Sequence, residues 1–519
     1  MRCFSVFQKG KTQMKKSLSV LLAALLLAGS LAACSTNSEN AADEQKNNQS
    51  NSQTPTADLT EEEETARFLD SMPETMDFEG RGLNFLLTEG SNGNITELSI
   101  WAEEDTGEVV DSAVFQRNLT VTDRLNITIN QPEVNTDWSG NATVIRNMVS
   151  AGSTDYDVFG AYQYYGIVIG SEGILYNLNN KENFPYNDFD REYWGSGYMK
   201  NMSFDGQKMY WATGDIALRY TGGMYVTYVN STIFSNYYPE LNLYSIVDEG
   251  SWTMDKVSEL SSAAYVDLNG NGSVDGNDQF GFVTQSNDLT DGIAAGCMVD
   301  FSTRDENNIP VISLDNEWTY KFWDKYYSLM FNNEACMLNP VGTDDSVAIM
   351  TAFSAGQFMM TDNKLYQSPI YLRDMEDDFK ILPMPKLDDT QPHYNTRIHD
   401  SCTLFGVPVS IGGTECLSAV LEALASESFK EVTPAYYEIA LKVKFTRDSD
   451  SGRMIELCHE NISIDFAAQW SNKLGDINHF FRGRADAKEE SIASTIAKNS
   501  KVWSKTMDKL IKAFEGLDD

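Results

Sequence analysis

Apolar and polar positions alternate with two different periods along most of the chain. Residues 83–87 and 127–129 are short apolar runs typical of buried strands, and residues 156–162 form a third run of this kind. Between them, residues 111–125 and 142–151 carry apolar side chains at helical spacing. We therefore predict a β-α-β-α-β order, which is typical of a parallel sheet with helices on both faces.

This predicted topology also indicates where a ligand would bind. In open parallel sheets, ligands collect at the carboxyl ends of the strands. Residues 88–110 and 163–169 follow the first and third predicted strands, and we read both segments as loops. They are the first places where we expect a binding site.

The C-terminal third is predicted to be more helical. Residues 417–425 carry an apolar stripe, and Thr433 and Pro434 form a suitable N-cap and first-turn proline for a helix over 435–443. A last helix over 500–517 places five large apolar side chains on one face: Trp503, Met507, Leu510, Ile511 and Phe514.

Length and charge narrow the class of protein. With 519 residues, the chain is too long for a single core, so we expect two or more lobes. Its 42% hydrophobic residues exclude wholesale disorder. Because 76 acidic residues face 39 basic ones, the net charge of −37 argues against nucleic acid and against an anionic membrane surface. The same charge, with no evident arginine cluster, disfavours an anionic solute.

The N-terminus has the features of an export signal. Five basic residues precede an uncharged apolar run over 17–33, which is too short to span a membrane and stay there. The run ends in LAACS at residues 31–35, which resembles the lipobox of bacterial lipoproteins. By that resemblance residues 1–33 are a signal peptide and Cys34 carries a lipid. The alternative is an ordinary secretory cleavage beside an incidental cysteine.

Removal of residues 1–33 takes away five basic residues and no acidic one. The mature chain then has 34 basic and 76 acidic residues and a net charge of −42. Residues 35–58 are rich in Ser, Asn, Gln and Thr and nearly free of large apolar side chains, so they are predicted to be a disordered tether. We expect an extracytoplasmic protein held at the membrane through Cys34.

The remaining cysteines show no metal-binding spacing. Five of them, at positions 297, 336, 402, 416 and 458, are scattered without a CxxC pair. An odd number leaves at least one unpaired, and we interpret all five as small buried thiols of the core.

One internal motif has the spacing of a metal site. In residues 267–278 (DLNGNGSVDGND), oxygen side chains occupy positions 1, 3, 5, 9 and 12, with glycine at position 6. This is the ligand spacing of an EF-hand calcium loop, except that Asp278 replaces the usual closing glutamate. The predicted Ca²⁺ ligands are Asp267, Asn269, Asn271, Ser273, Asp275 and Asp278. The alternative is an Asn/Gly-rich turn without an ion.

Aromatic side chains are the second candidate feature. Several lie in predicted loops rather than on periodic faces: Trp101, Tyr162, Tyr164, Tyr165 and Trp211. Flat rings beside hydrogen-bonding groups suit sugar rings, although most tryptophans and tyrosines fill a core. Tyr164 and Tyr165 follow a predicted strand directly and are therefore the more specific candidates.

Catalytic signatures are absent from the sequence. The four histidines form no HExxH pattern, and the chain has no G-x-S-x-G, Walker A or G-x-G-x-x-G motif. His399 and Asp400 are adjacent, but such a pair is usually polar surface rather than a catalytic dyad. We expect no enzyme.

Several segments together resemble the extracellular solute-binding proteins of carbohydrate ABC importers, the group that includes maltose-binding protein. The lipobox and tether begin the resemblance. Five further segments are similar to features of that family: SWTMD at 251–255, the calcium-type loop and strand at 267–282, AGQFMM at 355–360, ILPMP at 381–385, and the helical tail at 420–447.

The resemblance implies a two-lobe α/β fold of the periplasmic-binding-protein type II, each lobe a mixed sheet flanked by helices. Mapped onto this sequence, the N-terminal lobe would comprise residues 78–211 and 384–433, and the C-terminal lobe 222–380 and 445–519. Hinge crossings would lie near 212–220, 381–383 and 433–445. By position, the resemblance implies these residues for the cleft: Trp101, Tyr162, Tyr164, Tyr165, Trp211, Asp215 and Asp362.

The function that the resemblance implies is binding without chemistry. A monomeric receptor would close its lobes around an oligosaccharide and deliver it to the permease subunits of an ABC importer. The alternative of a different class is a secreted, calcium-stabilised lipoprotein glycoside hydrolase. We prefer the receptor, because it expects a tether, chain crossings between lobes and no catalytic signature.

Overall fold

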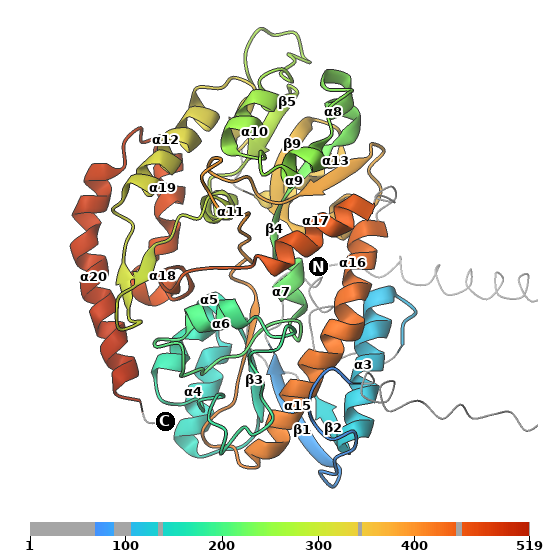
Figure 1. Cartoon of the computed structure of the whole chain (residues 1–519), viewed down its shortest axis with the longest axis vertical. Coiled ribbons are helices and arrows are strands. Elements are labelled where there is room, and N and C mark those ends of the chain that lie inside the picture. Colours follow the sequence, from blue (N-terminus) through green and yellow to red (C-terminus); the bar gives the residue numbers. More distant parts are fainter. Residues whose placement is uncertain (1–67, 88–104, 133–138, 341–344, 443–448, 518–519) are drawn as a thin grey trace, which may run out of the picture. The chain divides into compact units, whose positions relative to one another are not determined.

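The computed structural model describes residues 68–87, 105–132, 139–340, 345–442 and 449–517. All of these belong to one compact unit. Cys34, the tether and Trp101 lie outside the described residues. Within this unit the strands form two main sheets and one small hairpin (Figure 1).

The first sheet has the order β11-β3-β1-β2. Strand β1 pairs in parallel with both β2 and β3, and β11 pairs with β3 in the antiparallel sense. The parallel β-α-β-α-β arrangement predicted from periodicity is therefore confirmed, with one late strand added from the C-terminal third. The elements of this sheet and its helices are β1 (Arg81–Leu87), α3 (Val109–Leu125), β2 (Ile127–Asn130), α4 (Asn141–Ala151), β3 (Val158–Tyr162) and β11 (Thr403–Gly406).

The second sheet has the order β10-β4-β9-β5-β8 and mixes parallel and antiparallel pairs. Every residue of β4, β5 and β9 is buried, as expected for strands covered on both faces. Its strands are β4 (Tyr225–Asn230), β5 (Phe280–Thr284), β8 (Cys336–Leu338), β9 (Phe358–Lys364) and β10 (Phe379–Leu382). Helices around it are α8 (Ser231–Tyr237), α9 (Leu243–Asp248), α10 (Met254–Ser261), α11 (Asp288–Gly296), α12 (Glu317–Phe331), α13 (Ser346–Ser354) and α14 (Ser368–Tyr371).

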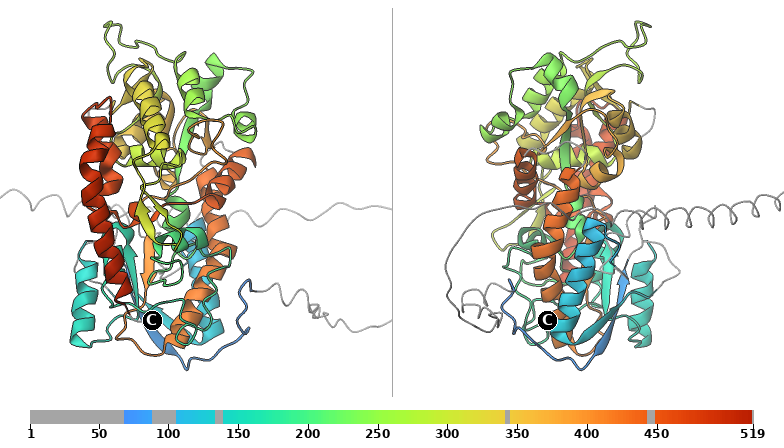
Figure 2. Two further views of the ribbon diagram at one scale, coloured as in Figure 1. Left: turned by 60° about the vertical axis from the view of Figure 1, so that its left-hand side comes forward. Right: turned by 90° about the vertical axis from the view of Figure 1, so that its right-hand side faces the viewer.

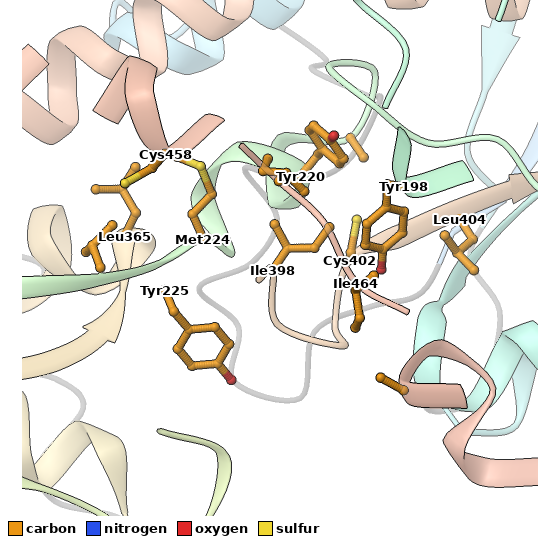
Figure 3. Packing of buried hydrophobic residues seen from close by; sticks show 14 of the residues in the cluster. Tyr198, Tyr220, Met224, Tyr225, Leu365, Ile398, Cys402, Leu404, Cys458 and Ile464 are labelled. Carbon is orange, nitrogen blue, oxygen red and sulfur yellow. The ribbon is translucent and has the colours of Figure 1, made fainter. Parts of the chain in front are cut away.

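The chain passes between the two sheets more than once. It leaves the first sheet after β3 and reaches β4 through α6 (Ser196–Met202) and α7 (Leu218–Gly222), and it returns between Leu382 and Thr403. These two connections touch, because Met224 bridges Ile398 and the amide of Tyr225 donates to the carbonyl of Arg397 at 3.0 Å. Figure 3 shows Met224, Ile398 and Cys402 among the buried side chains where they meet.

The predicted start of a helix at Thr433 and Pro434 was wrong. Thr433 is not an N-cap, because α15 (Thr414–Glu427), a π-helical turn η4 (Ser428–Val432) and α16 (Thr433–Lys442) follow one another without a break. Pro434 cannot donate a backbone hydrogen bond, and the wider π turn just before it relieves the clash that a proline causes inside a helix. The hydroxyl of Thr433 donates to Asp215 instead, at 2.6 Å.

The C-terminal residues pack against both parts of the unit. They comprise α17 (Ser449–Glu460), α18 (Phe466–Gln469), η5 (Ser471–Leu474), η6 (Ile477–His479), α19 (Phe480–Asp486) and α20 (Ala493–Glu515). Helix α20 begins earlier than predicted and contacts η2 (Ile167–Ser171) as well as the hairpin of β6 (Ser302–Arg304) and β7 (Pro310–Ile312) (Figure 2). Phe514 stacks on Phe204, with ring centres 5.7 Å apart.

Candidate ligand-binding site

A cavity of about 780 Å³ lies where the two connections meet the ends of both sheets. Such a volume is in the range of pockets that hold small organic ligands. Its lining comes from β3 and α5 (Gln163–Gly166), the start of α3, α7, α11, β9, α13, α16, α19 and the connection before β11. Because these elements belong to both sheets, a bound molecule would contact both parts of the unit at once.

Three tyrosines form one wall of this cavity. Tyr162 ends β3, and Tyr164 and Tyr165 follow in α5, with ring centres of the latter two 4.8 Å apart in an edge-on arrangement. Tyr164 also stacks on His479 at 5.7 Å, and its hydroxyl donates to Asp476 at 2.7 Å. These contacts fix the rings, and fixed ring faces suit stacking against the C–H face of a sugar.

A buried ion pair forms another part of the lining. The ammonium of Lys364, at the end of β9, lies 2.6 Å from Asp288 at the start of α11. Burial by itself raises the pKa of the Asp288 carboxyl, but the charge of Lys364 and its hydrogen bond to Asp288 outweigh that effect and hold the pKa well below its usual range. Asp288 is therefore an anion at neutral pH.

His399 connects this pair to the rest of the site. Its Nε2 lies 3.4 Å from Asp288, and its Nδ1 lies 2.8 Å from the hydroxyl of Ser401 and 3.5 Å from Asp400. Burial lowers the pKa of His399 to about 4, against the opposing influence of Asp400 and Asp288. The ring is therefore neutral at neutral pH and serves as a hydrogen-bonding group rather than a charge.

The cations of the lining are held differently from one another. Arg482 donates from Nε and Nη2 to Asp291, with a shortest N–O distance of 2.5 Å, and from Nη1 to Asn287 at 2.6 Å. Arg219 donates from Nη1 to Ser401 at 2.6 Å. A neutral group of the lining is also hydrogen-bonded. Tyr162 donates to Asp400 at 3.4 Å, and burial together with that carboxylate raises the pKa of Tyr162 well above its usual range. We call the polar residues opposite the tyrosine wall the polar floor of the cavity: Arg219, Asp288, Lys364, His399, Asp400 and Arg482.

No known protein-family profile matches the chain, and no curated protein sequence does. Solved structures are similar. The galacto-N-biose-/lacto-N-biose I-binding protein of the ABC transporter from Bifidobacterium longum matches with a TM-score of 0.54 at 12% identity, over 85% of this chain and 99% of that one. The cyclic alpha-maltosyl-1,6-maltose binding protein from Arthrobacter globiformis matches at 0.52 and 12%, over 83% and 99%. UspC of M. tuberculosis matches at 0.51 and 13%, over 82% and 100%.

The chain has the fold of the sugar-binding proteins of ABC importers. The resemblance inferred from sequence is thereby confirmed at the level of the fold. The first two structural neighbours are binding proteins rather than enzymes. Within this solute-binding fold, the assignment of individual residues to the ligand stays a prediction.

The solute-binding fold brings some of the predicted residues together and separates others. Tyr162, Tyr164 and Tyr165 all line the cavity, whereas Trp211, Asp215 and Asp362 do not. Tyr164 and Tyr165 lie in the helical turn α5 rather than in the loop that we predicted after β3.

The three residues away from the cavity are buried elsewhere in the solute-binding fold. Trp211 is 2% exposed, packs on Phe159 and donates from its indole nitrogen to the carbonyl of Ile167 at 3.2 Å. Asp215 accepts from Thr433 and lies 3.4 Å from Nε2 of His459. Asp362 is fully buried in β9, and within the described residues its carboxylate oxygens make no well-formed hydrogen bond.

Sequence reasoning missed most of the polar lining. His399 and Asp400 line the cavity, so their interpretation as polar surface was wrong. The expectation that the chain has no arginine cluster was also wrong, because Arg219, Arg373 and Arg482 line the same cavity together with Lys364. These residues come from separate segments, and no local spacing in the sequence connects them.

The calcium-type loop lies apart from this cavity. Across the described residues, no three His, Cys, Asp or Glu side chains converge as a ready metal cluster. The loop is nevertheless ordered by its own oxygens: Asp267 accepts from the amides of Gly270 and Gly272, at 2.7 and 2.9 Å. Asp278 is fully buried with one carboxylate oxygen unpartnered among the described residues. This oxygen-rich donor set, with an unsatisfied buried oxygen, fits a hard cation such as Ca²⁺.

Two further expectations concern the core and the membrane. All five cysteines in the described part of the chain are buried and unpaired, which confirms their interpretation as core thiols. Among the described helices, none combines the length and the apolarity that a bilayer crossing requires.

Proposed function

We propose that the chain is the extracytoplasmic solute-binding subunit of an ABC importer and captures a carbohydrate in the cavity described above. The observation that carries this proposal is the position of the cavity. Its aromatic wall (Tyr162, Tyr164, Tyr165) belongs to the part built on the first sheet, while Asp288 and Lys364 belong to the part built on the second. A sugar would stack on the wall and hydrogen-bond to the opposite side.

Because both parts of the unit contribute to the lining, ligand binding would be coupled to closure of the two parts. A ligand that contacts both parts favours their closed arrangement by the free energy of the contacts made only when closed. Membrane permease subunits would then recognise the closed form and receive the sugar. No group of the cavity is required to make or break a covalent bond in this sequence of events.

Calorimetry of the mature chain, residues 34–519, tests the proposal. We would titrate a panel of plant and host oligosaccharides in the presence of calcium and analyse each sugar afterwards by chromatography. Saturable one-to-one binding with the sugar recovered intact supports the receptor. Cleaved sugar would instead support the glycoside hydrolase, and no binding across the panel would remove carbohydrate from the proposal.

The lipid anchor is a separate part of the proposal. Cys34 within LAACS and the polar residues after it support attachment of a lipid at this position and a location outside the cytoplasm. Mass spectrometry of the membrane-extracted protein should find a lipid-modified N-terminal Cys34. The Cys34→Ser variant should be released from the membrane fraction, and an unmodified Cys34 in the natural protein would remove the anchor.

We also propose that residues 267–278 bind one structural Ca²⁺. The EF-hand spacing and the unsatisfied buried oxygen of Asp278 support it. The side-chain oxygens of Asp267, Asn269, Asn271, Asp275 and Asp278 and the backbone carbonyl of Ser273 would hold the ion. Bound there, the ion would stabilise a loop between α10 and β5, away from the sugar.

A further inference from the structure

Arg219 is a buried charge that faces the ligand cavity without a carboxylate partner. It lies in α7, at the connection between the two sheets, and is 4% exposed. Its Nη1 donates to the hydroxyl of Ser401 at 2.6 Å, and its guanidinium carbon lies 4.5 Å from the ring centre of Tyr366. Within the described part of the chain, no Asp or Glu oxygen lies within ion-pair distance of it.

The neighbouring buried cations are different in this respect. Lys364 has Asp288 at 2.6 Å, and Arg482 has Asp291 at 2.5 Å. Arg397, which does not line the cavity, shares Asp291 with Arg482 and lies 3.7 Å from it. Each of these three cations therefore has a carboxylate within ion-pair distance, which Arg219 lacks among the described residues.

The hydrogen bond to Ser401 does not compensate the charge of Arg219. His399 is neutral, and its Nδ1 accepts from the backbone amide of Ser401 at 3.1 Å, so Nδ1 carries no hydrogen and the Ser401 hydroxyl donates to it. The oxygen of that hydroxyl then accepts from Arg219. The serine is thus oriented to receive one N–H of the guanidinium, but it brings no negative charge.

A buried guanidinium without a carboxylate partner of its own favours binding of an anion from outside the protein. Arginine stays protonated at any physiological pH, and a buried charge without a counter-charge is unfavourable. The Tyr366 ring lies beside the guanidinium, with its centre 4.5 Å from the guanidinium carbon. The N–H groups of an arginine lie in the plane of the guanidinium, and through them it binds a carboxylate by two parallel hydrogen bonds.

We propose that Arg219 binds the carboxylate of an acidic saccharide, so that the solute contains a uronic acid residue. This inference rests on the proposed function and names its substrate class. A carboxylate fits better than a phosphate, because Asp288 and Asp400 already line the same cavity and would oppose a second negative charge. The net charge of the whole chain does not oppose the assignment, because salt screens distant surface charges beyond about 8 Å at physiological ionic strength.

The test compares ligands that differ only at the carboxyl group. Trigalacturonate and β-1,4-linked triglucuronate are each titrated as the free acid, the methyl ester and the neutral parent trisaccharide. We expect one free acid to bind roughly 10- to 100-fold more tightly than its ester and its neutral parent, as a charge-assisted pair requires. A phosphorylated control, galactose 6-phosphate, should bind less tightly than that acid.

The second arm changes the protein. Arg219→Gln keeps a hydrogen-bond donor and removes the charge, so the affinities of this variant for the acid, the ester and the neutral parent should lie within about threefold of one another. Arg146→Gln, on α4 and paired with Glu172 away from the cavity, is the matched control and should keep the preference. If Arg219→Gln does not fold, the comparison of acid with ester on the natural protein still decides.

The outcomes separate the two proposals. Tight binding of neutral sugars with equal or weaker binding of the acids overturns the role of Arg219 and leaves the receptor intact. A higher affinity for the phosphorylated sugar than for every uronate overturns the carboxylate assignment. No binding of any saccharide overturns the proposed function, and this inference with it.

Discussion

Lys364 and Asp288 join strand β9 to helix α11 through a 2.6 Å contact on the wall of the ligand cavity. The side chains of Lys364 and Asp288 are only 3% and 13% exposed. A pair so deeply buried is stable only while both charges are present, because each compensates the other in a medium that solvates neither well.

Removing one member should therefore destabilise the fold strongly. We expect Asp288→Asn to lower the free energy of unfolding by about 3 kcal/mol, since it leaves the Lys364 ammonium buried without its partner. Urea denaturation measures the change. The double variant Asp288→Asn/Lys364→Met should recover most of the loss, and a double variant as unstable as the single one would contradict this account.

The tyrosine wall and the nearby tryptophan should respond to mutation in opposite ways. Tyr165→Ala should weaken saccharide binding by about 10-fold or more with little effect on stability, because the half-buried ring loses a stacking surface. Trp211→Ala should instead lower stability by about 3–5 kcal/mol, since it empties a packed site beside Phe159. Calorimetry and urea denaturation of both variants check the pair, and the reverse pattern would place Trp211 in the site.

Asp362 should impose a pH dependence on stability. Burial raises its pKa to about 7 in the fold, against an ordinary value of 3.8. A raised pKa means that the contribution of the group is favourable below pH 3.8 and is lost as the pH rises through 7. Asp362→Asn cannot ionise at this position. Its free energy of unfolding should therefore rise relative to that of the natural protein between pH 4 and pH 7, by roughly 2–4 kcal/mol in total.

Denaturation at a series of pH values measures that difference. Asp508→Asn, on the exposed side of α20, is the control and should differ from the natural protein by the same small amount at every pH. A flat difference for Asp362→Asn would show that its carboxyl group titrates normally.

Calcium should stabilise the natural protein and not the loop variants. At millimolar Ca²⁺ we expect the Tm to rise by roughly 2–5 °C, as binding to the native state alone requires. Asp267→Ala and Asp275→Ala should abolish the rise, because each removes a carboxylate ligand, while Asp508→Ala should keep it. Scanning calorimetry with calcium, magnesium and chelator checks this, and no calcium effect on the natural protein would leave residues 267–278 as a turn without an ion.

Local patterns predicted the elements well, and the reason is physical. The run over 83–87 and the periodicity over 111–125 report burial of neighbouring residues, and β1 and α3 follow them closely. Tyr164 and Tyr165 could be found for a related reason, because the end of a parallel strand is where ligands bind. The continuous helix through Thr433 could not, since proline ordinarily marks a helix start and only the π turn before Pro434 makes its interior position possible.

The polar floor of the site depends on contacts that no local pattern encodes. Asp362 and Lys364 lie two residues apart on one strand, yet only the terminal Lys364 reaches the cavity. Arg219, Asp288 and His399 come from three separate segments that are brought together only in the folded structure. Their roles follow from the fold and could not be predicted before it.

The five buried cysteines allow local unfolding of the native protein to be measured by thiol labelling. All are unpaired, and burial raises the pKa of Cys336, Cys402 and Cys458 to about 12, so the folded protein offers these sites as unreactive thiols. Cys336 lies in β8, Cys402 next to β11, and Cys458 in α17, so each reports on a different region. The rate at which a maleimide labels each site then measures how often that region unfolds, with no engineered probe.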